Sequence, residues 1–157
     1  MLIAHISIPA DDTRHVAEVL AEILEGEATP LPPAGPKGWK VWAGDGTIDL
    51  EVVERGALIK KGPVEGYWDR QPAIVRGSEA HAAICVNRPE AEIIAIARKA
   101  GWTARHCDRG GGFFSLAEVW IEESFLIEFL DPAQTAIYRE RVNARGWKAK
   151  LAEMRPA

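Results

Sequence analysis

The sequence predicts an α+β fold made of two tandem βαβββ modules, each a strand, a helix and three further strands, followed by a C-terminal helix. Three observations predict it. Strand and helix patterns come in the same order in both halves of the chain. The halves also match around a Val-Trp pair, and each has a histidine in its first strand and a glutamate in its last.

Module one begins with a strand over residues 2–8, which is expected to end at Pro9. Asp11 or Asp12 can cap the helix that follows, and Gly26 stops it. The apolar residues of this helix recur at helical spacing and form one stripe: Val16, Val19, Leu20, Ile23 and Leu24.

The rest of module one is predicted from turn signals. Residues 29–36 contain too many prolines for a helix or a central strand and are expected to form an extended edge or a loop. Strands are expected over 39–43 and 48–54, joined by a Gly-Asp-Gly turn. Residues 55–79 show no clear period and are predicted to be a linker, with room for a lid or a short hairpin.

Module two covers residues 80–132 and repeats the pattern. It opens with a strand over 80–86, and a helix runs from Pro89 to Gly101. Three strands are then expected: 102–107, 113–122 and 125–130. The predicted organisation is therefore one domain over 1–132, with module one at 1–54, linker 55–79 and module two at 80–132, and a helical extension over 133–157 opened by Pro132.

Composition excludes several classes of protein. Apolar residues make up 47% and charged residues 27% of the 157 residues, a balance typical of globular proteins. The net charge of −4 gives no field that would attract nucleic acid, and the apolar runs are too short for a membrane span. No signal peptide is evident, so we expect a cytoplasmic protein with reduced Cys85 and Cys107.

The repeat brings four chemically important residues into register. Residues 41–51 align with 119–128 when one extra turn residue is allowed in the first copy. His5 then precedes Glu51 by 46 positions, and His81 precedes Glu128 by 47. A single strand histidine is more often hydrogen-bonded than metal-bound, but the joint spacing favours a common metal site.

The predicted strands place these residues on the sheet face away from the helices. A glutamate there would cost several kcal/mol if it were buried without a partner, and a metal ion would compensate its charge. Two imidazoles and two carboxylates suit a borderline divalent ion such as Zn, Ni, Co, Mn or Fe(II).

A paired βαβββ architecture with His5 and His81 in the first strands, and Glu51 and Glu128 in the last, resembles the vicinal oxygen chelate superfamily. This superfamily includes glyoxalase I, methylmalonyl-CoA epimerase, extradiol dioxygenases, and fosfomycin and bleomycin resistance proteins. The resemblance covers residues 1 to about 132. It implies two curved half-sheets that form a mixed sheet around a metal-binding cavity, with these four residues as ligands.

The resemblance also implies a function. The expected protein is a metal-dependent lyase or isomerase of the glyoxalase or epimerase type, which moves a proton next to a carbonyl group of a small substrate. Glu51 or Glu128 would serve as the base. Two alternatives remain open: an Fe(II) extradiol-type dioxygenase using His5, His81 and Glu128, and a binding protein of the resistance type without catalysis. A homodimer is expected, because the superfamily often pairs chains.

Overall fold

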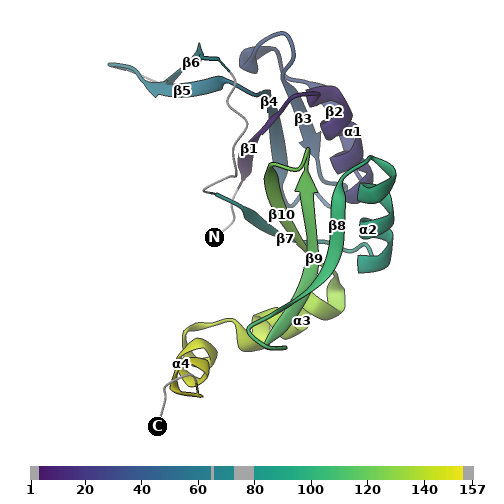
Figure 1. Cartoon of the computed structure of the whole chain (residues 1–157). Helices are drawn as coiled ribbons and strands as arrows, with labels where there is room; N and C mark the ends of the chain where they lie inside the picture. The colour runs from purple at the N-terminus through teal and green to yellow at the C-terminus, as the bar shows by residue number, and fades with distance from the viewer. Residues whose placement is uncertain (1–3, 65, 73–79, 154–157) are drawn as a thin grey trace.

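Both predicted modules are present in the structure, a computed structural model that describes residues 4–64, 66–72 and 80–153 (Figure 1). Module one consists of β1 (His5–Ala10), α1 (Thr13–Ile23), β2 (Glu27–Pro30), the short 3-10 helix η1 (Pro32–Ala34), β3 (Trp39–Trp42) and β4 (Asp49–Glu54). Module two consists of β7 (Ala82–Cys85), α2 (Glu90–Lys99), β8 (Thr103–Arg109), β9 (Phe114–Ile121) and β10 (Phe125–Leu130).

Each module forms a four-stranded mixed sheet. The strand orders are β1-β4-β3-β2 and β7-β10-β9-β8, so equivalent strands take equivalent places in the two sheets. The first and last strands of each module pair in parallel, and the other pairs are antiparallel. The predicted α+β class and the order of the elements in the repeat are confirmed.

One apolar core spans both modules. The predicted stripe of α1 is buried, and its residues pack with β-strand residues such as Ile8 and Leu50 of module one and Phe129 of module two. Helices α1 and α2 also lie side by side on one side of the molecule (Figure 1). Fully burying a large aliphatic side chain contributes about 1.5–3 kcal/mol, so this shared core stabilises the packing of the two modules against each other.

The first strand runs further than predicted. We expected it to end at Pro9, but β1 continues through Pro9 to Ala10. This is possible because β1 lies at the edge of its sheet and, among the described strands, pairs with β4 alone. The missing N–H of the proline therefore costs no ladder bond on the open side. The helix then starts at Thr13, capped by Asp12, whose side chain accepts from the His15 N–H at 3.1 Å.

The proline-rich segment 29–36 overlaps the end of β2 (Glu27–Pro30). Its beginning belongs to β2, which is the other edge of the sheet and pairs with β3 in an antiparallel register. The prolines that follow form η1. The expectation of an extended edge is therefore confirmed for the beginning of the segment.

The linker carries a hairpin of β5 (Ala57–Lys61) and β6 (Gly66–Arg70), which pair with each other and with no other described strand (Figure 1). Its side chains Leu58, Ile59 and Tyr67 are exposed. Arg70 and Lys37 both form ion pairs with Glu54 at the end of β4, which ties the base of the hairpin to module one. Hydrogen bonds from Lys37 and Arg70 also lower the pKa of Glu54.

The C-terminal extension holds two helices, not the single helix predicted. They are α3 (Pro132–Arg141) and α4 (Ala144–Glu153). The chain leaves the helical conformation at Val142, and the Asn143 side chain accepts from the N–H groups of Arg145 and Gly146 at 3.1 and 3.0 Å. Asn143 thus caps a new helix, because Asn side chains satisfy the free N–H groups of a first turn.

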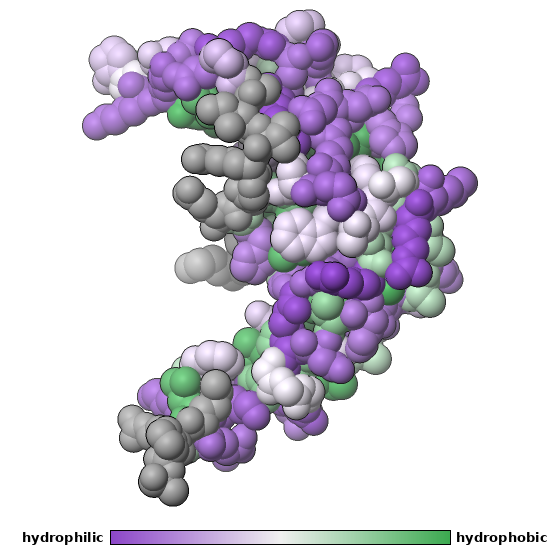
Figure 2. All heavy atoms as spheres, viewed as in Figure 1, coloured by the Kyte–Doolittle hydropathy of each residue, from purple (hydrophilic) through white to green (hydrophobic). Residues whose placement is uncertain are grey.

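The face of the molecule in Figure 2 is mostly polar. Figure 2 shows hydrophilic residues over most of one face, with the hairpin and the C-terminal helices standing out at opposite ends. None of the described helices is long and apolar enough to cross a membrane.

Candidate metal centre

The predicted ligands of module one lie side by side on neighbouring strands. His5 is the first residue of β1, and Glu51 lies in β4, which runs parallel to it. Their side chains face one another, with His5 Nε2 3.9 Å from Glu51 Oε1. The other carboxylate oxygen of Glu51 accepts a hydrogen bond of 2.9 Å from the Ser7 hydroxyl.

The predicted ligands of module two form an equivalent pair. His81 directly precedes β7, and Glu128 lies in the parallel strand β10. His81 Nε2 is 3.7 Å from Glu128 Oε2. Glu128 is buried, whereas both histidine side chains are more than half exposed, at 51% for His5 and 58% for His81.

The strand register explains why the two pairs look alike. Glu51 stands opposite Ser7, and Glu128 stands opposite Ala83, which is in each case the second residue after the histidine. Side chains two residues apart in a strand share a face. Each glutamate therefore comes to lie beside the histidine of its own module.

In both pairs, the distance between the histidine nitrogen and the glutamate oxygen suits an ion bound by both side chains better than a direct hydrogen bond. A hydrogen bond requires about 2.7–3.2 Å between nitrogen and oxygen. Two ligand atoms on one ion, each about 2.0–2.2 Å from the metal, can lie up to roughly 4.2 Å apart. The measured separations of 3.9 and 3.7 Å fall within that span.

The structure brings the predicted ligands together as two pairs and not as a group of four. Across the described ranges, no three His, Cys, Asp or Glu side chains are close enough to hold one ion. A single centre that includes His5, Glu51, His81 and Glu128 therefore stays a prediction.

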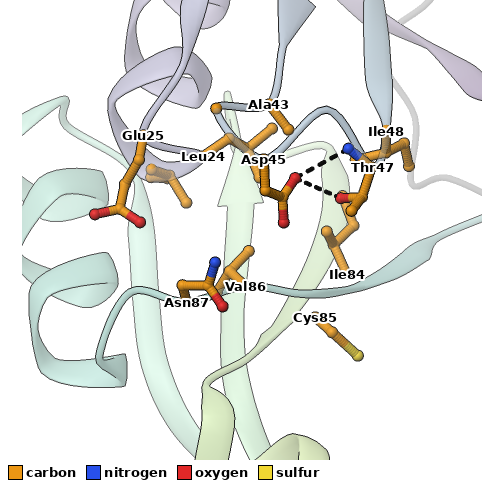
Figure 3. Close-up of a pocket in the computed structure, with 12 residues that line it drawn as sticks. Leu24, Glu25, Ala43, Asp45, Thr47, Ile48, Ile84, Cys85, Val86 and Asn87 are labelled. Atoms are coloured by element: carbon orange, nitrogen blue, oxygen red, sulfur yellow. Dashed lines mark hydrogen bonds between the residues drawn. The ribbon is translucent and has the colours of Figure 1, made fainter.

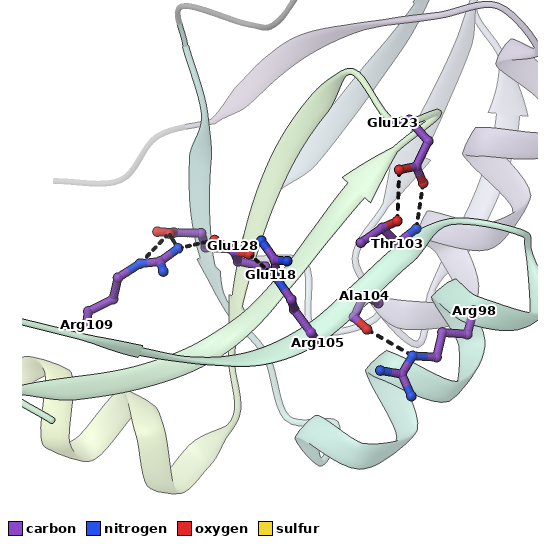
Figure 4. Close-up of polar contacts among 8 residues, drawn as sticks. All are labelled: Arg98, Thr103, Ala104, Arg105, Arg109, Glu118, Glu123 and Glu128. Carbon is purple, nitrogen blue, oxygen red and sulfur yellow. Dashed lines mark hydrogen bonds and ion pairs between the residues drawn. The ribbon is translucent and has the colours of Figure 1, made fainter. Parts of the chain in front are cut away.

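A charged network that the sequence did not reveal surrounds Glu128 (Figure 4). Glu118 of β9 stands opposite Glu128 in the antiparallel register and is only 6% exposed. The Arg109 guanidinium donates to both carboxylates, at 2.5 Å to Glu118 and 2.7 Å to Glu128. Arg105 donates a further bond of 2.7 Å to Glu118.

This network fixes the charge of Glu118. Burial by itself raises the pKa of the carboxyl group, but hydrogen bonds from Arg109, Arg105 and Cys107, together with the charge of Arg109, outweigh it. The pKa of Glu118 is lowered to about 2. Glu118 is thus an ionised, buried carboxylate on the same sheet face as Glu128.

Module one has a smaller version of this network. Asp49 lies opposite His5 in the parallel register, with Asp49 Oδ1 4.0 Å from His5 Nδ1. That oxygen is buried and has no hydrogen-bond partner. Lys40 lies 3.2 Å from Asp49 Oδ2 and 3.9 Å from Glu51 Oε1. A buried, unsatisfied carboxylate oxygen beside an imidazole fits a site made to compensate a positive charge.

A separate cleft of about 290 Å³ lies between the modules, where the end of α1, the β3–β4 turn and β7 meet (Figure 3). Its central carboxylate, that of Asp45, accepts hydrogen bonds from the N–H and the hydroxyl of Thr47 at 3.0 and 2.6 Å. None of the four predicted ligands lines it. This cleft is distinct from both histidine–glutamate pairs.

No protein-family model matches the sequence, and no curated protein matches it. Solved structures do match. The fosfomycin resistance protein FosX from Mesorhizobium loti is 12% identical, covers 90% of this chain and 97% of its own, and has a TM-score of 0.56. FosX from Listeria monocytogenes in complex with Mn(II) and sulfate is 13% identical over 88% of this chain and 95% of its own, with a TM-score of 0.57. An integron cassette protein from V. cholerae is 11% identical, covers 82% of this chain and 93% of its own, and has a TM-score of 0.50.

FosX proteins belong to the vicinal oxygen chelate superfamily and consist of paired βαβββ modules. This chain has the vicinal oxygen chelate fold. The resemblance noted from the sequence is thereby confirmed for the fold. At these levels of identity the likeness covers the arrangement of the chain and does not extend to substrate or metal.

Proposed function

We propose that this protein binds one divalent metal ion with His5, Glu51, His81 and Glu128, and that it is a lyase or isomerase acting on a small carbonyl compound. The observation that supports the proposal best is the equivalence of the two pairs. Each is a histidine and a glutamate on parallel neighbouring strands, separated by 3.9 and 3.7 Å. The vicinal oxygen chelate fold and the Mn(II) bound by the Listeria FosX add support.

A second copy of the chain would allow the His5–Glu51 pair of one copy to meet the His81–Glu128 pair of the other. The strands β1 and β7 that begin the modules are edge strands, and neither pairs with a strand on its open side within the described residues. Open edges favour pairing with another strand. We therefore propose a homodimer in which each metal ion lies between His5 and Glu51 of one copy and His81 and Glu128 of the other.

The ion, when bound, would polarise a substrate carbonyl and stabilise negative charge that develops on its oxygen. The protein residues would then handle the proton. A glutamate carboxylate would remove the proton from the carbon next to the carbonyl to leave an enolate, and would return the proton to the enolate to complete the isomerisation. The exposed faces of His5 and His81 leave this side of the sheets open to a small molecule.

Metal analysis of the purified protein tests the proposal. We expect close to one divalent ion per chain after dialysis against Mn(II), Zn(II) or Ni(II). Glu128→Ala should reduce metal affinity by about 100-fold or more, because it removes a direct ligand. Glu27→Ala, at an exposed position in β2, is the matched control and should bind normally. Wild-type protein that takes up none of these ions would refute the proposal.

A resistance-type protein is the second candidate. Arg109 donates to Glu128, and Arg105 donates to Glu118, which stands opposite Glu128 in the next strand. These two guanidinium groups would suit an anionic substrate. A Listeria FosX variant has been solved with Mn(II) and 1S,2S-dihydroxypropylphosphonic acid, which is an anion of this kind. Calorimetric titration of the Mn(II)-loaded protein with fosfomycin distinguishes the candidates, since heat of binding or turnover would favour the resistance function.

A further inference from the structure

Exposed apolar side chains gather in two elements that project from the domain. Among the described residues, eight large apolar side chains are exposed, and seven of them lie in these elements. The first element, here called the hairpin arm, runs from β5 to β6, and the second, the helical arm, consists of α3 and α4. Single exposed apolar residues are normal, but clusters of them mark interaction sites. The hairpin arm exposes Leu58, Ile59, Val64 and Tyr67, and the helical arm exposes Ile137, Trp147 and Leu151.

The hairpin arm has no packing partner in the described part of its own sheets. Its two strands pair with each other and with no other described strand. The register places Ile59 opposite Trp68 on one face, whereas Leu58 and Tyr67 lie on the other face. The arm therefore presents apolar side chains on both faces. A two-stranded hairpin by itself is marginally stable in water, so the arm needs a further surface to pack against.

The helical arm is fixed at its base but not at its end. Tyr138 of α3 packs edge-to-face on Phe114, with 5.1 Å between the ring centroids, and Arg141 donates to the Phe113 carbonyl at 3.0 Å. By contrast, none of the residues of α4 is buried, and the Trp147 ring meets Phe113 with half of its surface still exposed. Isolated helices as short as these 10 residues are marginal in water. We therefore expect α4 to be stabilised by packing on another surface.

The distribution of charge favours a second copy of the chain as that surface. Residues 132–157 contain six basic and two acidic side chains, a net charge of +4. The whole chain carries −4, which leaves −8 on residues 1–131. A second copy would thus bring an acidic domain to the basic helical arm, and opposite charges across an interface favour association. The hairpin arm is close to neutral, at +1 over residues 57–70, so its own contacts would be mainly apolar.

We propose that the hairpin arm of one copy packs against the helical arm of the other, so that Ile59 meets Trp147 across the interface. The two arms lie at opposite ends of the molecule, with the open edge strands β1 and β7 between them (Figure 1). A two-fold axis beside these strands exchanges the ends, so the contact is made twice and covers both apolar clusters. This inference rests on the proposed homodimer but not on a bound metal ion.

Sedimentation equilibrium of the full-length, metal-free protein tests the contact. We expect wild type to be a dimer. Ile59→Ser and Trp147→Ala should each raise the dimer dissociation constant by about 10-fold or more, because each removes an apolar anchor from two equivalent contacts. Leu151→Ser should act in the same direction and serves if either variant does not fold, which thermal unfolding verifies.

Trp42→Ala is the matched control for Trp147→Ala. The two tryptophan side chains are similarly exposed, at 43% and 48%, but Trp42 lies in β3, outside both arms. It already has partners in its own chain, since its Nε1 donates to the Thr29 hydroxyl at 2.9 Å and Lys40 lies over its ring. Its loss should leave the dimer dissociation constant within about 3-fold of wild type.

A double variant tests whether the two arms touch each other. Because Ile59→Ser and Trp147→Ala remove two sides of one contact, the combined variant should raise the dissociation constant by less than the product of the two single increases. An increase equal to that product would mean that the two side chains contact different surfaces, and it would overturn the proposed pairing of the arms.

Two further outcomes would overturn the contact in different ways. If Ile59→Ser and Trp147→Ala both dimerise as tightly as wild type, the arms lie outside the interface and the homodimer stands. If wild type is a monomer at every concentration, the contact and the homodimer are both refuted. Binding of that monomer to vesicles of phosphatidylserine and phosphatidylcholine would then assign the basic helical arm to an anionic membrane surface.

Discussion

The guanidinium of Arg55, directly after the last strand of module one, donates a hydrogen bond of 3.1 Å to the carboxylate of Glu122 in module two. Glu122 also accepts from the N–H groups of Asp11 and Asp12, at 2.6 and 2.8 Å, just before α1. A second bond from Arg55, of 2.9 Å, reaches Ser124. The turn between β9 and β10 is thereby bound to the opposite module at a helix start, where negative charge is favourable.

Glu122→Gln should therefore destabilise the whole protein. The amide keeps the size of the side chain but removes its charge and one acceptor. The Arg55 side chain, which is 9% exposed, then loses the more buried of its two carboxylate partners and keeps only the exposed Asp11. We expect a loss of about 1–3 kcal/mol in the free energy of unfolding, measured by urea denaturation. Glu22→Gln, on the exposed side of α1, should stay within about 0.5 kcal/mol of wild type. Equal stabilities for the two variants would contradict this role for Glu122.

Glu118 should make stability depend on acidic pH. Its pKa in the folded protein is about 2, below the ordinary value of 4.5. A carboxyl group with a lowered pKa stabilises the fold above the unfolded pKa, and this contribution disappears as pH falls from about 4.5 to 2. Urea denaturation should show a loss on the order of 1–3 kcal/mol over this range. Glu118→Gln should be less stable at pH 7 but flatter below pH 4.5, and parallel pH profiles would disprove the assignment.

Gly26 and Gly101, each of which lies shortly after one of the helices α1 and α2, should tolerate alanine differently. A Cβ atom at Gly26 would lie 1.7 Å from the Trp42 carbonyl oxygen, so the backbone would have to move. Gly101 has a φ of +84° and nothing within 4 Å of the added atom. We expect Gly26→Ala to cost roughly 3 kcal/mol or more and Gly101→Ala about 1 kcal/mol, measured by thermal unfolding. A larger cost at Gly101 would show that strain in φ outweighs the clash.

Mixing two defective chains tests the proposed homodimer. His5→Ala and His81→Ala should each bind Mn(II) weakly on their own, because every site lacks one histidine. When the two proteins are unfolded and refolded together, mixed dimers would contain one site with all four ligands, so tight Mn(II) binding should return. If wild type binds tightly but the mixture does not recover, the ion is held within a single chain.

The sequence was sufficient to predict the repeat but not every boundary. The Val-Trp register and the helical stripe correctly predicted two βαβββ modules, because hydrophobic periodicity directly reflects which face is buried. The continuation of β1 through Pro9 was not predicted, because the sequence does not show that β1 is an edge strand. An edge strand tolerates a proline that a central strand would not. The break at Asn143 was missed because a single capping side chain can start a new helix within a continuous charged pattern.

The sequence predicted one centre for His5, Glu51, His81 and Glu128, whereas the structure brings these residues together as two pairs. Backbone register places each histidine beside the glutamate of its own module, and the strand alternation used for the prediction did not reveal this grouping. The antiparallel register of β9 and β10 places Glu118 opposite Glu128, but nothing in the sequence indicates that Arg109 bridges the two carboxylates. That contact depends on the reach and rotamer of one long side chain from β8, which spacing alone does not determine.

Strand register fixes the positions of Glu51 and Glu128, and this affects which substitutions a protein with a duplicated module can accept. Hydrogen bonds of the main chain hold the carboxylates in place, so exchanges at neighbouring side chains leave their positions intact. A serine opposite one carboxylate and an alanine opposite the other represent two such exchanges. Each half of an ancestral repeat could then specialise by altering one nearby donor, without any rearrangement of the scaffold.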